Sequence, residues 1–214
     1  MLFRSTHWGI IATVTAIQFL AFDFGYWLGH AAQHRSAVLW EFHKVHHSAL
    51  VMTPATEYRQ HPVELVLMPS VIGLVTGLAY AVTTQLLGSG APGLGHLGFN
   101  LIILAHLLTF HHLRHSHINM AFTGILGRLL HSPGHHLIHH SADPAHFDRN
   151  MGYILSIWDW LAGTLVVPKR GERLTLGIGA EGLTHDSVAK AMWLPVRGAW
   201  RLVVHRQAGQ RARF

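Results

Sequence analysis

Three long apolar stretches limit what this chain can fold into. They run from about Trp8 to Gly29, from Pro62 to Leu87 and from Leu94 to Phe110. A helix needs about 20 apolar residues to cross a bilayer, and it satisfies its own backbone hydrogen bonds in lipid. We therefore expect an all-α, polytopic membrane helical bundle with three crossings. The second and third stretches, joined by a glycine-rich turn at 88–93, could instead form a re-entrant pair.

The basic residues indicate which side of the membrane the loops occupy. With three crossings, segment 30–61 and everything after residue 110 share one side, which holds all 16 Lys and Arg residues except Arg4. The positive-inside rule places that side in the cytoplasm. The net charge of +6 then fits anionic lipid headgroups, and we expect no nucleic acid partner.

The chain is long enough for one domain, 1–214. Its motif-bearing core covers about residues 8–165. The stretch 169–214 is less apolar and rich in Gly and Arg. We expect it to be a cytoplasmic tail with a short amphipathic helix near 187–202.

Histidine is the second unusual feature, since the chain has 21 histidines and no cysteine. Thiolate metal sites are therefore excluded, whereas imidazole is the commonest metal ligand. Most of the histidines fall in four groups that the expected topology places at the cytoplasmic face, as parts of a helical cap. The groups are His30 and His34; His43, His46 and His47; His111, His112, His115 and His117; and His131, His135, His136, His139 and His140.

The spacing within these groups suits metal binding. Helical residues four apart lie within about 40° of each other, one turn apart, so His30 and His34 can reach one cation. In H-x-x-H-H, at 43–47 and 136–140, the first and last imidazoles pair in this way, and the middle one points about 100° from the last. One short helix can therefore supply ligands to two adjacent ions. The pair and the two triads provide eight imidazoles, enough for two ions with room for oxygen or water.

Nitrogen ligands alone leave the metal open, because imidazole suits iron, zinc, copper and nickel. No H-E-x-x-H motif is present, so a zincin-type protease has no support. The alternatives to an oxidation enzyme with two irons are a zinc-dependent membrane hydrolase and a non-enzymatic metal-binding or haem-binding membrane protein. Haem with two histidine ligands needs one facing pair per haem, which does not account for the triads.

Seven motifs lie between residues 8 and 165. They are D-F-G-Y-W-L-G-H-A-A-Q-H (23–34), L-W-E-F-H-K-V-H-H-S (39–48), T-E-Y-R-Q-H-P-V-E (56–64), H-I-N (117–119), S-P-G-H-H-L-I-H-H-S (132–141), N-M-G (150–152) and W-D-W-L-A-G-T (158–164). Together they resemble the fatty acid hydroxylase/sterol desaturase superfamily. Two positions depart from the pattern: Ala31 stands where arginine is common, and Met151 where tyrosine is usual. These departures affect substrate contacts more than metal binding.

The resemblance implies an O2-dependent oxidoreductase with two iron ions that hydroxylates or desaturates a C–H bond of a sterol, a fatty acyl chain or a related lipid. Zinc could substitute for the iron. Eight ligands carry over to this sequence: His30, His34, His43, His46, His47, His136, His139 and His140. A ninth ligand is expected from the 111–117 group, with His117 favoured over His115 and His111.

Four further residues are expected not to bind the metal themselves but to support its ligands. Asp23 falls on one helical stripe with His30 and His34, so it faces the bundle interior, where hydrogen bonding is its expected role. His61, Asn150 and Asp159 are assigned similar roles, although Asp159 equally suits a helix cap.

Electrons must reach such a site from another protein, because the sequence contains no dinucleotide-binding fingerprint. A ferredoxin or cytochrome-type donor with an acidic face would suit the basic cytoplasmic surface.

Overall fold

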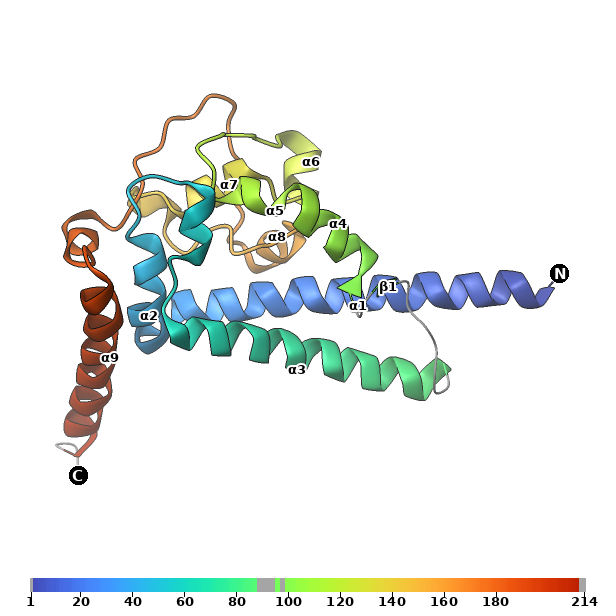
Figure 1. Cartoon of the computed structure of the whole chain (residues 1–214), viewed down its shortest axis with the longest axis horizontal. Helices are drawn as coiled ribbons and strands as arrows, with labels where there is room; N and C mark the ends of the chain where they lie inside the picture. The colour runs from blue at the N-terminus through green and yellow to red at the C-terminus, as the bar shows by residue number, and fades with distance from the viewer. Residues whose placement is uncertain (1, 88–94, 97–98, 212–214) are drawn as a thin grey trace.

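Two long helices form the framework of the molecule (Figure 1). The computed structural model describes residues 2–87, 95–96 and 99–211, so the predicted turn at 88–93 lies outside the described residues. Helices α1 (Leu2–Arg35) and α3 (Pro62–Leu87) lie side by side and antiparallel, and the other elements lie along α1 from about its middle to its C-terminal end. The fold is mostly helical, as predicted.

Helices α1 and α3 are long and apolar enough to cross a membrane over Trp8–Arg35 and Pro62–Leu87. They approach closely where α1 carries glycine: an added Cβ at Gly25 would lie 3.1 Å from the Cα of Ile72. Small residues permit such close contacts between apolar helices. The first two predicted stretches therefore form the two candidate membrane spans.

The third predicted stretch, Leu94–Phe110, does not form a full span in the part that the structure describes. A two-stranded antiparallel pair, β1 (Gly95–His96) and β2 (Phe99–Asn100), precedes α4 (Leu101–Thr109). Nine helical residues extend about 13.5 Å, well short of the roughly 30 Å hydrocarbon core. The Asn100 amide donates a hydrogen bond to the carbonyl of Thr15 at 2.8 Å, so the chain rejoins α1 partway along its length. Unlike α1 and α3, the described part of the third stretch forms no helix long enough to cross, which contradicts the predicted third crossing.

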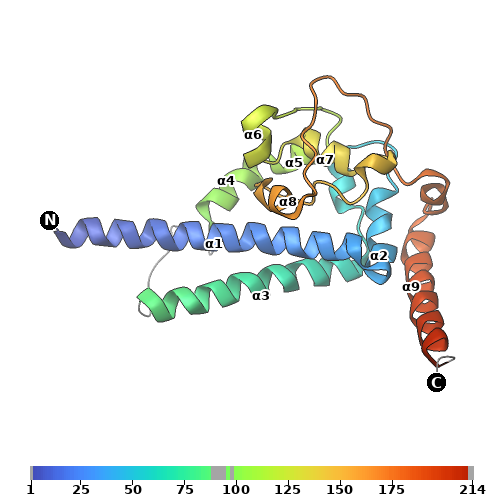
Figure 2. The ribbon, with the colours of Figure 1, turned by 180° about the vertical axis from the view of Figure 1, so that it is seen from behind.

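The shorter helices form a cap along one side of the second half of α1 and across its end (Figures 1 and 2). They are α2 (Ala37–His47), η1 (Pro54–Tyr58), α5 (His111–Arg114), α6 (Gly124–Leu129), α7 (Pro133–His139), η2 (Pro144–His146) and α8 (Ile157–Ala162). Asp23 of α1 forms hydrogen bonds with α8 and with the residues that precede α8. Its carboxylate accepts hydrogen bonds from the backbone N–H groups of Ile154 and Leu155 at 2.8 and 3.2 Å, and from the indole of Trp158 at 2.8 Å.

The last part of the chain folds onto α2. After η3 (Gly179–Thr184), helix α9 (Val188–Arg211) crosses the cap end of the α1–α3 pair (Figure 2). Its buried residues Ala191 and Ala199 lie two turns apart, whereas Trp193 and Trp200 are exposed. The predicted amphipathic helix near 187–202 is therefore present, and it extends further than predicted.

Candidate metal centre

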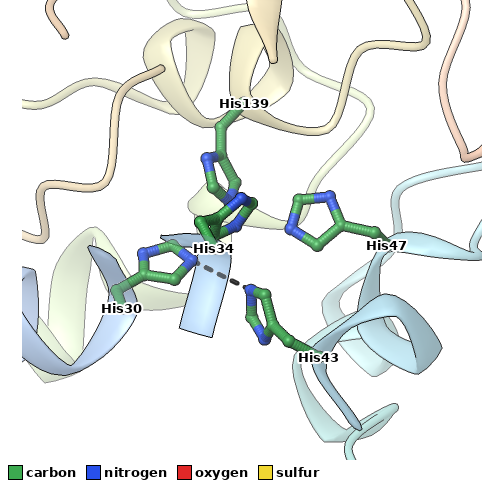
Figure 3. Close-up of side chains that lie close together, drawn as sticks. All are labelled: His30, His34, His43, His47 and His139. Atoms are coloured by element: carbon green, nitrogen blue, oxygen red, sulfur yellow. Dashed lines mark hydrogen bonds between the residues drawn. The ribbon is translucent and has the colours of Figure 1, made fainter. Parts of the chain in front are cut away.

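Nine buried or nearly buried histidines converge in the cap as two adjacent groups. Within each group, one ring nitrogen from every residue lies within 4.8 Å of the others. The first group is His30, His34, His43, His47 and His139, and Figure 3 shows its five rings turned toward one another. The second group is His46, His115, His136 and His140. The imidazoles of His47 and His140 stack at 4.2 Å between centroids, so the two groups touch.

Each H-x-x-H-H triad divides between the two groups. His43 and His47 of α2 enter the first group, and the intervening His46 enters the second. On α7 the arrangement is reversed: the pair His136 and His140 enters the second group, and His139 enters the first. This is the divergence expected from about 100° of rotation per residue.

Local sequence fixes where both triad helices begin. Ser36 precedes α2, and its side chain accepts a hydrogen bond from the backbone N–H of Leu39 at 3.4 Å. Ser132 and Pro133 begin α7, with proline in the first helical position, where its missing N–H is not needed. The residue at which each helix begins determines the directions in which the histidines that follow leave the helix.

The spacing of the ring nitrogens fits shared metal ligands. The Nε2 atoms of His30 and His43 are 3.1 Å apart. The Nε2 atom of His115 lies 3.0 Å from Nε2 of His46 and 2.7 Å from Nε2 of His136. Two imidazole nitrogens at about 2.0–2.1 Å from one ion and at right angles around it would be roughly 2.9 Å apart. The residues present therefore fit metal ions in both groups.

Several ring nitrogens in the first group are buried and have no hydrogen-bond partner in the described part of the chain. They are the Nε2 atoms of His34, His47 and His139. A buried, unpaired polar atom is costly, and three such atoms turned toward one centre are explained if they bind a cation.

Burial also keeps these imidazoles neutral and able to donate a lone pair. Desolvation, reinforced by neighbouring imidazoles, lowers the pKa of His46, His47 and His140 well below its usual value. Burial lowers the pKa of His139 to about 3.

Partners on the opposite ring nitrogen hold four of the rings in place. The Nδ1 atoms of His30 and His139 lie 2.9 and 2.8 Å from the carbonyl oxygens of Met151 and Arg149. Such contacts fix the ring orientation and direct Nε2 to the metal side. Carboxylates play the same part for two further rings: Glu64 lies 2.5 Å from Nδ1 of His43, and Glu57 lies 2.6 Å from Nδ1 of His115.

Arg114 is a buried cation beside the second group. Its guanidinium lies over the rings of Tyr26 and Tyr153, at 5.2 and 4.7 Å, and its Nη2 is 3.1 Å from Nδ1 of His136. Burial works to raise the pKa of Glu57, but His115, Arg114 and His111 together lower it to about 2. Glu57 is therefore a carboxylate at neutral pH and balances part of this positive charge.

The sequence favours His117 for the ninth position, whereas the structure buries His115 among the other histidines. His117 is exposed and belongs to neither group, whereas His115 is buried in the second. The helical turn α5 ends at Arg114, and the chain carries His115 inward and His117 outward. His111 lies outside both groups, and its Nδ1 is 2.9 Å from the hydroxyl of Tyr153.

We expect this difference to be measurable with matched variants two residues apart. His115→Ala should lower the bound metal by about one ion per chain, because it removes a ring nitrogen from a group of four. His117→Ala should leave the metal content unchanged, because its side chain is exposed. Metal analysis of the two purified variants tests this, and a loss only in His117→Ala would restore the original assignment.

The four predicted supporting residues act at a greater distance than expected. Among the described residues, Asp23, Asn150 and Asp159 form their hydrogen bonds with groups other than the histidine side chains of the two groups. Asp159 instead accepts hydrogen bonds from the backbone N–H groups of Met151 and Gly152 at 3.0 and 2.7 Å, and so places the carbonyl that contacts His30. The Asn150 amide donates to the carbonyls of His135 and Val166, and His61 joins the start of α3 to Met192 of α9.

Three residues close to the site were missed as site residues: Glu57, Glu64 and Arg114. Glu64 carried a usable signal, because an ionisable residue at the start of an apolar stretch is functional by default. Glu57 lies in the motif at 56–64, but nothing in that motif relates it to a histidine of the 111–117 group, and Arg114 carried no signal, because only the fold brings it to the histidines.

We expect Asp159→Ala to destabilise the cap. The carboxyl is fully buried, burial raises its pKa, and its removal leaves the N–H groups of Met151 and Gly152 unpaired. Each unpaired buried donor costs about 1–3 kcal/mol, and each kcal/mol corresponds to roughly 2–4 °C in Tm for a chain of this size. Thermal unfolding in detergent would measure the loss. Asp186→Asn, which alters an exposed pair with Lys190, is the control, and equal Tm values for the two variants would contradict the expectation.

Two cavities reach the histidines from different sides. The loop cavity, of 520 Å³, lies beside the 177–181 segment and touches His34, His47 and His139 of the first group. The helix chamber, of 160 Å³, lies where α1, α2 and α3 meet and touches both groups: His30 and His43 of the first, His46 and His115 of the second.

Fold and site together define a class of protein: a mostly helical chain with two long apolar helices and two touching groups of buried histidines that could hold metal ions. The chain belongs to the fatty acid hydroxylase family, whose sequence model matches residues 15–164. The resemblance drawn from the motifs is thereby confirmed.

Curated relatives agree with this family. The chain is 25% identical to the alkylglycerol monooxygenase of Caenorhabditis elegans over 85% of its own length and 32% of the relative's. It is 30% identical to the human alkylglycerol monooxygenase, over 68% of this chain and 29% of the relative. It is also 30% identical to the ornithine lipid hydroxylase OlsE of Rhizobium tropici, over 73% of this chain and 43% of the relative. The chain thus spans about a third of the length of the first relatives. No solved structure matches it significantly.

Proposed function

We propose that this protein is a membrane-bound, O2-dependent oxidoreductase with two iron ions that hydroxylates a C–H bond of a lipid. The observation that carries the proposal is the division of each histidine triad between two touching groups, which suits a pair of adjacent ions. When bound, two irons supply the activation of O2 that attack on an unactivated C–H bond requires. The names of the relatives, a monooxygenase and a lipid hydroxylase, favour hydroxylation over desaturation.

The number of ligands favours iron over zinc. Zinc sites in proteins are almost always four-coordinate, and catalytic ones keep three protein ligands. The first group offers five imidazoles, more than either kind of zinc site uses. Zinc remains a chemical substitute, because imidazole binds both metals.

The chain itself supplies geometry and exclusion of water. Nine imidazoles hold the ions, and Glu57, Glu64 and the carbonyls of Met151 and Arg149 orient four of the rings. Full burial of rings such as His136 and His140 keeps solvent away from the reacting centre.

Membrane placement follows from the exposed apolar surface. Along α3, Leu74, Leu78 and Leu86 are between 65% and 78% exposed. Helices α4, α6 and α8, on the part of the cap nearer the N-terminal half of α1 (Figure 1), expose further apolar residues. These are Ile102, Leu108, Ile125, Leu126, Leu129, Trp160 and Leu161. We place α1 and α3 across the bilayer as a multi-pass arrangement, with this part of the cap against the lipid.

The cytoplasm is the proposed side for the cap and its histidines. All Lys and Arg residues except Arg4 lie at or after the cap end of α1, in agreement with the positive-inside rule. An external donor of the ferredoxin or cytochrome type would deliver electrons to this basic face, drawn by its charge.

The decisive experiment compares the protein loaded with iron and with zinc in lipid nanodiscs. With iron, a chemical reductant and ¹⁸O2, we expect a lipid product that contains ¹⁸O, and with zinc no product. Activity of the zinc form without O2 would instead identify a hydrolase. A Soret band in the purified protein would identify a haem protein.

A further inference from the structure

The helix chamber contains a buried amide whose oxygen has no partner. Gln33 of α1 is 1% exposed and lines the chamber, and its Oε1 atom has no hydrogen-bond partner among the residues that the structure describes. The Nε2 atom of the same amide donates to the carbonyl of Gly29 at 3.4 Å, one helical turn earlier. That contact leaves Oε1 as the free end, since turning the amide over would set two oxygens against each other.

Of the two cavities described above, the chamber reaches both histidine groups at once. The loop cavity, although larger, touches the first group only. The chamber is also lined by Leu65, Met68 and Pro69 of α3, and Leu65 is 60% exposed. A lipid could therefore enter from the side of α3 without passing through water.

Size and polarity restrict which part of a lipid fits. At 160 Å³ the chamber is smaller than the roughly 300–1,000 Å³ of a typical ligand pocket, so it admits only a short segment of a lipid. Gln33, Gln60, Glu57 and Tyr26 contribute polar groups to its wall. A plain methylene segment would leave the Gln33 oxygen buried and unpaired, at a cost of about 1–3 kcal/mol.

We infer that Gln33 is a specificity-determining residue that binds a polar group of the substrate. The ligand is a lipid with an O–H or N–H donor, such as a hydroxyl or a secondary or primary amide, within a few bonds of the carbon at the histidines. Mid-chain methylenes remote from any donor are poor ligands of this chamber. The inference rests on the proposed function, because the bound lipid is taken to be the substrate. The binding of the lipid can nevertheless be tested without turnover.

A matched pair of lipids tests the binding on the iron-loaded protein without O2, so that no turnover occurs. Dodecanamide carries N–H donors, whereas N,N-dimethyldodecanamide has the same chain and carbonyl but no donor. We would measure the partition of each between empty phosphatidylcholine nanodiscs and nanodiscs that contain the full chain. The wild type should retain dodecanamide about tenfold better, which corresponds to roughly 1.4 kcal/mol.

Two variants of α1 sharpen the test. Gln33→Leu should abolish the preference for the donor lipid, whereas Gln18→Leu should keep it. Gln18 is a suitable control because it lies on the same helix, its Nε2 is also buried and unpaired, and it does not line the chamber. Iron bound by Gln33→Leu should equal that of the wild type, because Gln33 belongs to neither histidine group.

The possible results separate this inference from the proposed function. Equal preference in wild type and Gln33→Leu, or no preference in the wild type, would overturn the role of Gln33. A wild-type product oxidised only at carbons far from any polar group would overturn it as well, while leaving the proposed function intact. If the iron-loaded wild type oxidises no lipid but Gln33 still selects the donor lipid, the proposed function fails and the binding site stands.

Discussion

Under the proposed function, in which the wild type binds two metal ions, a His139→Ala variant is expected to lose the ion held by the first group. His139 belongs to the triad on α7, but its ring lies with His30, His34, His43 and His47 rather than with its own neighbours on that helix. Its Nε2 is buried and unpaired, and its Nδ1 is held by the carbonyl of Arg149 at 2.8 Å. The second group keeps all four of its rings in this variant. Iron analysis of the purified protein would give the ratio, and oxidised lipid should fall to background because a single ion remains.

Double variants test how the triads divide. His139→Ala combined with His43→Ala removes two rings from different helices but from one group, so one ion should remain. His139→Ala combined with His140→Ala removes two adjacent residues that belong to different groups, so both ions should be lost or greatly weakened. The reverse pattern would mean that each helix holds its own ion, and it would contradict the grouping in the structure.

The division of the triads is the part of the site that sequence predicts best. The rotation of a helix is fixed by local geometry, so the spacing His43, His46, His47 determines that the middle ring diverges from the last, wherever the helix packs. The same regularity placed Asp23 on the inward side of α1. In the structure Asp23 is fully buried and accepts hydrogen bonds from Ile154 and Leu155.

The third apolar stretch shows where hydropathy misleads. Its composition suits a span, but Gly95 and His96 pair with Phe99 and Asn100 as short strands before α4 begins. Glycine favours such non-helical backbone, and the Asn100 side chain accepts from the backbone N–H of Ile102 to start a new helix. A window of average hydropathy cannot detect these interruptions.

Residues that act only through tertiary contacts could not be predicted from spacing. The choice of His115 over His117 depends on how the chain leaves α5, after Arg114. Glu57 reaches His115 from a segment 58 positions earlier in the chain, and no local pattern relates the two residues. Such partners become visible only when the fold is known.

Removal of Glu64 is expected to weaken one ion about 10–100-fold, the usual cost of losing a group that orients a metal-bound histidine. Glu64 is 3% exposed, and its carboxylate lies 2.5 Å from Nδ1 of His43 in the first group. In Glu64→Ala the His43 ring loses this acceptor and its Nδ1–H is left buried without a partner. Glu64→Gln keeps an acceptor oxygen, so its loss should be smaller. Competition with a chelator would give the affinity of each ion.

Glu57→Ala provides the complementary measurement, because Glu57 lies 2.6 Å from Nδ1 of His115 in the second group. Each variant should therefore weaken a different ion, and the double variant should weaken both. Glu41→Ala is the control: Glu41 lies on α2 beside the triad, but it pairs with Lys44 at 2.7 Å and belongs to neither group. If Glu41→Ala costs as much as Glu64→Ala, the effect arises from the charge of the cap as a whole. If only Glu64→Ala and Glu57→Ala weaken binding, each at its own ion, two carboxylates orient two distinct metal ions.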